Sequence, residues 1–410
     1  MVHEPNRHLL RSVGWGWLRL PGEKRRMDKV DREFRELADK FGKDKDGKGS
    51  QTADPVVPSD GPRVVVFGAT AFDSLSRYDG SFDENLSRSA SIAERDDGEP
   101  GDARVSRELI AVRAEDVSLR NGGIAANICF GMSNLGVTPV LLSAIGADGE
   151  AYLEKLRSQG VDVRFVEVVA NKRTDRFDSV TDIHGKEVSF FHRGASFYDS
   201  YLNLSHVLDA VENIRFVLIT SSDLPTMIRH TALARERGVN FVADPSRLLR
   251  QEATSRENVI RLIEGADYLI HNQYERYELN ARAQLSDEEV SRMVRVRVTT
   301  KGPNGVDIES SHGKVTVAPA SVHDRIDPTG LGDSFRAGFF GGLAKGLELE
   351  YAARLGCVLA ALTLDSLGTQ TYWSSSEDVL KRWRESYDDD SDVIIARTIF
   401  GISTERSRRK

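Results

Sequence analysis

A carboxylate behind two glycines is the feature of this sequence most suited to chemistry. In DPTGLGDSFRAGFF, Gly330 and Gly332 precede Asp333, and a strong helical pattern follows. Glycine permits positive φ, so the amides of Gly330, Leu331 and Gly332 can converge on an anion where the helix dipole also favours one. Such a turn suits a phosphoryl group in transfer, and Asp333 could accept a proton from an incoming hydroxyl. The alternative is an ordinary helix start, with an acid favoured by the dipole and small residues for close helix packing.

Two other stretches offer groups that bind hydroxyls. In RNGGIAANICFG, Gly122 and Gly123 precede an apolar helix whose early turns carry Asn127, an amide that both donates and accepts hydrogen bonds. Asp73 follows the first expected strand, RVVVFGA, at its carboxyl end, where open α/β sheets collect ligand groups. A carboxylate there can bind two sugar hydroxyls. More simply, paired glycines before a helix form a turn.

A third signal is the pair Asn272 and Glu275 in HNQYE, after the expected strand ADYLI. The pair can support a magnesium–phosphate assembly through water, although the spacing is also typical of a plain helix start. The stretch GKDKDGKGS from Gly42 nearly matches a phosphate-binding loop, but it has Gly49 where a hydroxyl is needed and follows a helical pattern instead of a strand. We interpret it as a solvated linker.

The composition is that of a soluble globular protein. The 410 residues are 40% hydrophobic and 29% charged with a net charge of −7, which is enough for one large domain or two smaller ones and gives no general attraction for a polyanion. No apolar run reaches the roughly 18 residues that a membrane-spanning helix needs. Cys129 and Cys357 lie far apart in apolar surroundings, which predicts buried thiols in a reducing compartment. We therefore expect no nucleic-acid or membrane partner and a cytoplasmic location.

From Arg63 onward, short apolar strands alternate with amphipathic helices. This pattern predicts a mainly parallel sheet with helices on both faces, a three-layer α/β/α sandwich. Residues 76–120, which contain the acidic insertion 87–104, and residues 172–197 interrupt the alternation and predict a small β lid over a site. The predicted organisation is an N-terminal extension at 1–61 with a short amphipathic helix, this domain at 62–400, and a basic tail at 401–410.

The motifs carry a family resemblance through their order. An N-terminal aspartate, Gly-Gly with a following Asn, N-x-x-E, T-x-G-x-x-G (TKGPNG) and G-x-G-D resemble the ribokinase or PfkB family of ATP-dependent sugar and nucleoside kinases. The resemblance spans roughly residues 63–395, and the joint occurrence is far more specific than any single motif. Within the family, DPTGLGDSFRAGF, ADPS, RVTTKGPNGVD and GTQ are most similar to bacterial adenosine kinases of the actinobacterial type.

The resemblance implies a role for each matching residue. Asp333 would be the general base, and the amides of Gly330, Leu331 and Gly332 would form the anion hole for the γ-phosphoryl group. The other implied roles are substrate hydroxyl binding by Asp73, Gly122, Gly123 and Asn127; magnesium and phosphate binding by Asn272 and Glu275, the latter through water; ATP binding by Thr300, Gly302 and Gly305; and a potassium loop at Asp327 and Gly368. Phe177 and Phe190, at lid positions, would sandwich a flat base or else form plain lid core.

The sequence departs from the adenosine kinases on the base side of the pocket. Arg247 and Leu248 follow Ser246, where those enzymes have two glutamines, and Ala69 stands in place of a serine. A guanidinium only donates hydrogen bonds, so Arg247 cannot match a purine edge as an amide does.

We therefore predict an ATP- and magnesium-dependent kinase for the 5′ hydroxyl of a nucleoside, with adenosine as the leading candidate and inosine, guanosine or cytidine as alternatives. A ribokinase-type sugar kinase and a catalytically silent nucleoside sensor are the other hypotheses. The resemblance also implies a homodimer paired through the lid strands.

Overall fold

The computed structural model describes residues 61–84, 114–184, 186–250, 254–373 and 375–402. The predicted leader helix, the glycine-rich linker, the acidic insertion and most of the basic tail lie outside these residues, so the domain boundaries stay predictions. Within the described part of the chain, no helix is both long and apolar enough to cross a membrane. Cys129 and Cys357 are free and buried, as predicted.

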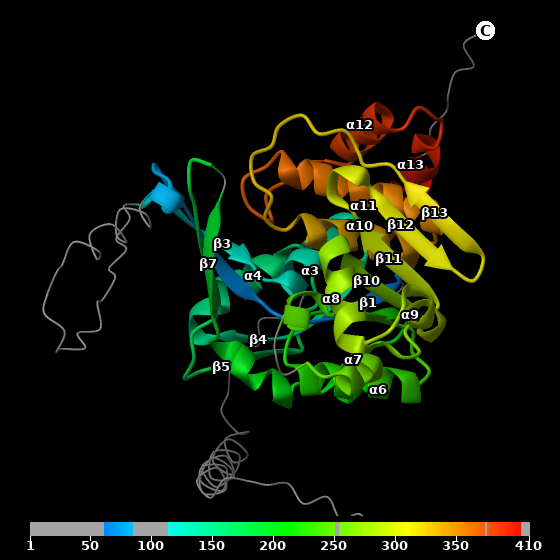
Figure 1. The fold of residues 1–410 in the computed structure, drawn as a ribbon, viewed down its shortest axis with the longest axis horizontal. Helices are drawn as coiled ribbons and strands as arrows, with labels where there is room; N and C mark the ends of the chain where they lie inside the picture. The colour runs from blue at the N-terminus through cyan, green and yellow to red at the C-terminus, as the bar shows by residue number, and fades with distance from the viewer. Residues whose placement is uncertain (1–60, 85–113, 185, 251–253, 374, 403–410) are drawn as a thin grey trace, which may run out of the picture. The chain divides into compact units, whose positions relative to one another are not determined.

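A central sheet of nine strands is formed by the described residues, in the order β13-β12-β11-β10-β9-β8-β1-β4-β5 (Figure 1). From β11 to β5 each strand runs parallel to its neighbours, and β12 and β13 add an antiparallel edge. The strands are β1 (Arg63–Phe67), β4 (Thr138–Gly146), β5 (Val166–Val169), β8 (Ile214–Ile219), β9 (Phe241–Ala243), β10 (Tyr268–Asn272), β11 (Val296–Thr300), β12 (Val306–Ser310) and β13 (Gly313–Val317).

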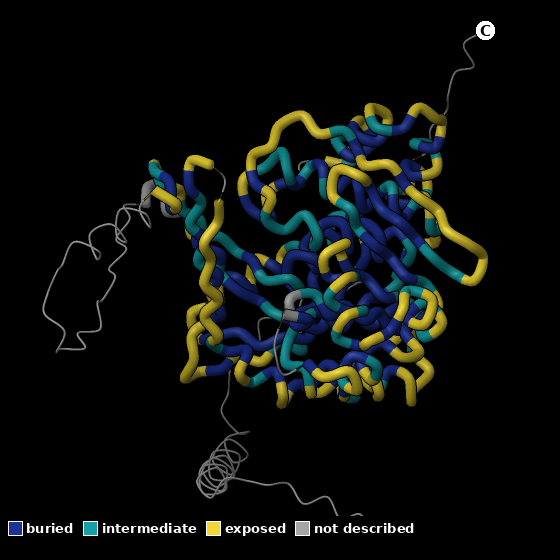
Figure 2. The backbone as a smooth tube through the Cα atoms, viewed as in Figure 1, coloured by how far each residue is buried: buried dark blue, intermediate teal, exposed yellow. Residues whose placement is uncertain are grey.

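Helices cover both faces of this sheet, which is why its strands are almost continuously apolar. In β1, Val64 and Val66 belong to the core shared with α3, α10 and α11, whereas Val65 and Phe67 belong to the core shared with α6, α7 and α8. The helices are α3 (Ile124–Asn134), α4 (Glu150–Ser158), α5 (Leu204–Ala210), α6 (Leu224–Glu236), α7 (Arg256–Ile263), α8 (Gln273–Ala283), α9 (Asp287–Met293), α10 (Leu331–Ala344), α11 (Leu349–Leu364), α12 (Ser376–Ser386) and α13 (Asp392–Phe400). Figure 2 shows the buried strands between the partly exposed helices. The predicted three-layer α/β/α sandwich is therefore confirmed.

A second, smaller sheet corresponds to the predicted lid. Its described strands follow the order β3-β2-β6-β7 and comprise β3 (Ala114–Gly122), β2 (Ala71–Tyr78), β6 (Asp175–Thr181) and β7 (Glu187–His192). The outer strand β7 is exposed along its whole length. The sheet begins at Ala71 and not at residue 76 as predicted, because β2 follows β1 after a short turn. Asp73 therefore lies on a lid strand.

The small residues of α10 allow it to pack closely against α11. A Cβ atom on Gly338 would lie 2.7 Å from the Cα atom of Gly356, and one on Gly356 would lie 2.8 Å from the ring of Phe335. Neither helix backbone could keep this approach with a side chain at those positions. The close helix packing that we considered for these glycines is thus present, and it accompanies the glycine turn that begins α10.

Asp199 is a buried carboxyl group whose ionisation opposes folding. It lies in the 3-10 helix η2 (Ala195–Tyr201), is 2% exposed, and accepts a hydrogen bond from Ser222 Oγ. Burial raises the pKa of Asp199 to about 7, against the hydrogen bond from Ser222, which lowers it. The folded-state pKa therefore lies above the unfolded value of about 3.9. The stability that this group contributes is complete below that value and is lost as the pH rises toward the folded-state pKa.

We therefore expect Asp199→Asn to raise the free energy of unfolding at pH 8 by on the order of 4 kcal/mol and to change it little at pH 4. Urea unfolding at the two pH values measures both quantities. Asp209→Asn is the control, because this exposed acid is paired with Arg237, which lowers its pKa. A gain of the same size at both pH values would show that the amide acts through packing and not through the missing charge.

Candidate functional site

The glycine turn before α10 has a left-handed residue and amides without main-chain acceptors among the described residues. Gly330 is left-handed, with φ 77°, and a Cβ atom there would lie 2.6 Å from Thr369 Cγ2. Its carbonyl accepts the amides of Asp333 (3.0 Å) and Ser334 (2.9 Å). Among the described residues, no main-chain hydrogen bond engages the amides of Gly330, Leu331 and Gly332. These three donors, at the positive end of a helix of 14 residues, are therefore available to an anion.

Asp333 lies at this turn and meets the start of α3. It is half-buried, and its Oδ2 atom accepts a hydrogen bond of 2.9 Å from Asn127 Nδ2. The structure thereby brings together residues 206 positions apart. The carboxylate lies at the sheet edge beside the predicted hydroxyl-binding residues, which is where a base for a substrate hydroxyl has to be.

The predicted hydroxyl-binding residues form one cluster. A Cβ atom on Gly122 would lie 2.1 Å from the carboxylate of Asp73, and Gly123, with φ 92°, is the residue before α3. Asp73 is 6% exposed and Asn127 4% exposed. Asn127 differs from expectation, because its amide faces Asp333 and its oxygen already accepts two hydrogen bonds.

Asn272 and Glu275 form a capping box at the start of α8. Asn272 Oδ1 accepts the amide of Glu275 (2.8 Å), and Glu275 Oε2 accepts the amide of Asn272 (2.8 Å). Glu275 Oε1 accepts a long hydrogen bond of 3.4 Å from Ser246 Oγ. No group of three or more His, Cys, Asp or Glu side chains that could hold a metal occurs among the described residues. The single carboxylate therefore fits a magnesium ion bound mainly by water and phosphate oxygens.

The predicted ATP-binding turn adjoins this capping box. Thr300 pairs with Asn272 in the register of β10 and β11. Gly302 (φ 55°) and Gly305 (φ 78°) bracket a short 3-10 turn, and a Cβ atom on Gly305 would lie 2.0 Å from the carbonyl oxygen of Val317. Only glycine fits position 305, where the turn packs against the main chain of Val317. The turn follows the carboxyl end of β11, where ligands of α/β sheets bind.

The loop that resembles a potassium site carries several hydrogen bonds. Asp327 accepts the amides of Thr329 and Gly368, each at 2.9 Å. The carbonyl of Leu367 accepts the guanidinium of Arg120 (3.1 Å), which reaches across from lid strand β3. Each of these oxygens keeps a further lone pair, so the potassium site stays a prediction.

Sequence reasoning missed a buried ion pair beneath the anion hole. Arg336 Nε and Nη2 donate to Asp244 Oδ2 (2.6 Å) and Oδ1 (2.8 Å), and Nη1 donates to the carbonyl of Gly332 (3.0 Å). The two side chains are 6% and 1% exposed. Burial disfavours the charge of Arg336, but the Asp244 carboxylate outweighs this and raises its pKa. The signal was an arginine alone in the apolar run FRAGFFGG, since a buried arginine needs an anionic partner.

The predicted aromatic pair does not share a face of the lid. Phe177 is in register with Asp73 on β2 and with Phe191 on β7, so these three side chains project from one face. Phe190 is in register with Asp178 and projects from the other. Phe177 and Phe190 therefore do not face the same side of the lid sheet, and Phe191 is the residue opposite Phe177.

Three residues on the predicted base side of the pocket depart from the adenosine kinase pattern, and one of them is only partly described. The backbone of Arg247 lies in the 3-10 helix η3 (Ser246–Arg250), but its side chain lies outside the described atoms. Leu248 is buried, with 1% of its surface exposed, so it belongs to the core. The carbonyl of Ala69 accepts the amide of Ala125 (3.1 Å) and joins the end of β1 to α3.

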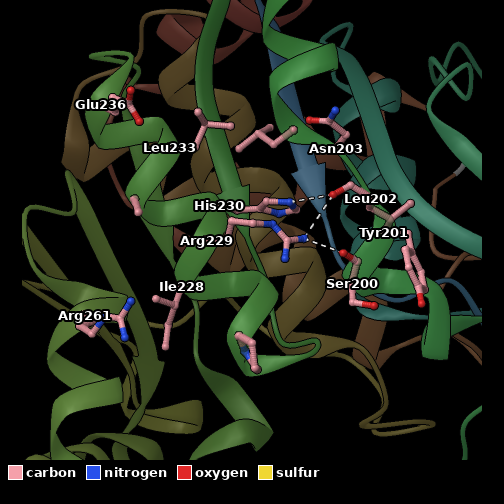
Figure 3. Close-up of a pocket in the computed structure, with 13 residues that line it drawn as sticks. Ser200, Tyr201, Leu202, Asn203, Ile228, Arg229, His230, Leu233, Glu236 and Arg261 are labelled. Atoms are coloured by element: carbon pink, nitrogen blue, oxygen red, sulfur yellow. Dashed lines mark hydrogen bonds between the residues drawn. The ribbon is translucent and has the colours of Figure 1, made fainter. Parts of the chain in front are cut away.

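A separate cavity of about 760 Å³ lies between α6 and the segment 200–204, and Figure 3 shows the side chains that line it. None of the predicted site residues lines it. Arg229 donates to the carbonyl of Ser200 (2.9 Å), and His230 Nε2 is 3.2 Å from the carbonyl of Leu202. These polar groups connect α6 with the segment 200–204, so we assign them a structural role and the cavity no function.

Comparison with known proteins identifies the family of this chain. Residues 101–376 match the profile of the pfkB family carbohydrate kinases, and the chain belongs to this family. It is a phosphotransferase acting on a hydroxyl group, with a ribokinase-like fold.

Three similar proteins illustrate the relationship. The nucleoside kinase of Methanothermobacter thermautotrophicus is 30% identical over 266 residues, which are 64% of this chain and 84% of that protein. The structure of Burkholderia thailandensis nucleoside kinase in complex with inosine has a TM-score of 0.69 at 23% identity, covering 80% of this chain and 98% of that one. The structure of Arabidopsis thaliana ribokinase complexed with ribose and ATP has a TM-score of 0.60 at 18% identity, covering 80% and 100%. The two structural likenesses concern the fold alone.

Proposed function

We propose that this protein phosphorylates the 5′ hydroxyl of a nucleoside with magnesium-ATP, as a cytoplasmic step of purine salvage, with adenosine as the leading acceptor. The observation that carries the proposal is the Asp333 carboxylate beside three amides with no main-chain acceptor among the described residues. A sensor would need neither the base nor the anion hole. The relationship to a nucleoside kinase and the inosine complex of a protein with the same fold support a nucleoside acceptor.

In the proposed reaction, the Asp333 carboxylate takes the proton of the 5′ hydroxyl as that oxygen forms a bond to the γ-phosphorus. The bond from this phosphorus to the bridging oxygen breaks, and ADP leaves with the electron pair. The amides of Gly330, Leu331 and Gly332 donate to the oxygens of the group in transfer. Magnesium, held through water by Glu275, would neutralise phosphate charge. Asp73 and Gly123 would orient the ribose.

The test is a screen of ADP release over adenosine, inosine, guanosine, cytidine and ribose, with and without potassium. We expect turnover with a nucleoside, and the comparison with and without potassium tests the predicted potassium loop. Arg247 lies in the segment after Asp244, and a donor-only side chain favours a base rich in carbonyl groups, so preference for inosine or guanosine over adenosine would be its signature. Turnover of ribose but of no nucleoside would favour the sugar-kinase hypothesis. Turnover of no acceptor would favour the hypothesis of a catalytically silent sensor.

Phe191→Ala is expected to raise KM for the nucleoside by about tenfold and to leave KM for ATP unchanged, because a base stacked on the lid loses one aromatic face. Phe190→Ala is a matched control one residue away, on the opposite face of the same strand. Steady-state kinetics of both variants measure the difference. Equal KM values for the two variants would argue against a base clamp at this face and favour a free sugar as acceptor.

We also propose that two copies pair through the lid sheet. The outer strand β7 is exposed along its length and carries Val188, Phe190 and Phe191, which are 37%, 58% and 49% exposed. Pairing of such strands would cover their open edges. Light scattering of the purified protein distinguishes a dimer from a monomer.

A further inference from the structure

A chain of buried side chains connects the Gly122 turn with Asp333. Tyr152 Oη donates to the carbonyl of Gly122 (2.8 Å), and Gln370 Nε2 donates to Tyr152 Oη (2.5 Å). The same Nε2 atom donates to Asn127 Oδ1 (2.9 Å), and Asn127 Nδ2 donates to Asp333 Oδ2 (2.9 Å). Tyr152, Gln370 and Asn127 are 2%, 6% and 4% exposed. The chain therefore joins the two ends of the site through groups shielded from water.

The orientation of the Asn127 amide follows from its partners. Its oxygen accepts Gln370 Nε2 at 2.9 Å, and its nitrogen faces Asp333. Thr369 Oγ1 also lies 2.9 Å from this oxygen, but its single hydrogen can instead go to the carbonyl of Asn121 at 3.1 Å, so Thr369 is compatible with either orientation. With the amide reversed, the Asn127 oxygen would face the carboxylate and its nitrogen would face the amino group of Gln370. Gln370 thus decides that Asp333 receives a hydrogen bond at this oxygen.

The orientation of the Gln370 side chain is set by its amide nitrogen. Its Oε1 atom is buried without a hydrogen-bond partner among the described residues, while Nε2 serves two acceptors. Burial raises the pKa of Tyr152 well above its usual value, so the hydroxyl stays protonated, donates to Gly122 and accepts from Gln370. A buried carbonyl oxygen without a partner is costly. The two hydrogen bonds that Nε2 donates, to Asn127 and Tyr152, therefore account for the orientation of the Gln370 amide.

We propose that Gln370 and Tyr152 are positioning residues for the catalytic base: they fix the Asn127 amide so that it donates to Asp333. This inference rests on the proposed function of Asp333. A donor on a carboxylate favours its ionised form, the form that accepts a proton, and restricts its rotation. This series of hydrogen bonds begins at the Gly122 carbonyl and ends at Asp333. The turn that would contact the ribose and the proposed catalytic base are therefore connected through the same hydrogen bonds.

The main test is Gln370→Glu, which replaces only the donating nitrogen by oxygen. Burial raises the pKa of the introduced carboxyl. Below that pKa its O–H group can donate to Asn127 Oδ1, and above it the negative charge turns the Asn127 amide away from Asp333. We therefore expect kcat within about threefold of wild type at pH 6 and about 30-fold lower at pH 8, with KM for ATP unchanged.

Tyr152→Phe tests the other end of the chain and does not depend on the folding of the first variant. Without the hydroxyl, Gln370 Nε2 keeps one of its two acceptors, and we expect a kcat about three- to tenfold lower, with the acid limb of the pH profile shifted upward. Tyr387→Phe is the matched control, because it removes another buried hydroxyl that donates to a main-chain carbonyl, that of Ala318. It should leave the pH profile of kcat unchanged.

The pH profile separates positioning from packing. A falling alkaline limb in Gln370→Glu that wild type and Tyr387→Phe lack supports the inference, and so does a shifted acid limb in Tyr152→Phe. Profiles parallel to wild type in both test variants overturn it, even if kcat falls, because a packing defect lowers activity equally at every pH. The proposed function is tested separately by turnover of the wild-type protein. If the wild type is active and the pH profiles are parallel, only the proposed role of Gln370 and Tyr152 is rejected.

Discussion

Asp333→Asn is expected to lower kcat by about 10³-fold and to leave the affinity for the nucleoside within a few-fold of wild type. An amide cannot accept the proton of the hydroxyl, but its oxygen can still accept the hydrogen bond from Asn127 Nδ2, so the local geometry is kept. Single-turnover ADP formation measures the chemical step, and titration calorimetry with the nucleoside measures binding.

Asp378→Asn is the control for the alternative that Asp333 is only an acid favoured by a helix dipole. Asp378 also lies in the first turn of a helix, α12, so its removal costs the same dipole interaction. The two variants should lose comparable stability but differ in kcat by orders of magnitude. Residual turnover of Asp333→Asn close to that of Asp378→Asn would exclude Asp333 as the base.

Arg336→Met is expected to lower the free energy of unfolding by about 3–5 kcal/mol, because it leaves the carboxylate of Asp244 buried without its partner. It also removes the hydrogen bond to the carbonyl of Gly332, so the anion-hole turn loses its support from below. Activity should fall more than stability alone predicts, measured at a temperature where the variant is fully folded. Urea unfolding and steady-state kinetics give the two quantities.

A double-mutant cycle identifies the cause of this loss. Adding Asp244→Asn to Arg336→Met should restore part of the stability, since the uncompensated charge is gone. Arg384→Met is the matched control: its ion pair with Glu377 is largely exposed and should contribute less than about 1 kcal/mol. If Arg336→Met cost no more than Arg384→Met, the buried pair would not support the turn.

Arg336→Lys separates charge from geometry in the same pair. Lysine keeps the positive charge but lacks the planar fork that donates to both oxygens of Asp244 and to Gly332 at once. Stability should recover further than kcat in this variant. Full recovery of kcat would mean that only the charge beneath the anion hole matters.

The architecture could be predicted from the sequence alone, and so could the glycine turn that begins α10. Apolar strands such as RVVVF alternating with amphipathic helices specify a sheet covered on both faces, because only burial on both sides makes a strand continuously apolar. The motif G-x-G-D predicted the left-handed residue at the start of α10 and the acid in its first turn. Glycine is needed there for a positive φ, and an aspartate is favoured by the helix dipole. These properties depend on neighbours in the chain, which a sequence displays.

Contacts between residues far apart in the chain could not be predicted from the sequence. The partner of Arg336 lies 92 positions away, and the partners of Gln370 lie 218 and 243 positions away, so no local pattern names them. The choice between Phe190 and Phe191 rests on strand register, and a shift of one residue exchanges the two faces of the lid. Composition and spacing constrain which side chains are buried, but only packing in three dimensions decides which of them meet.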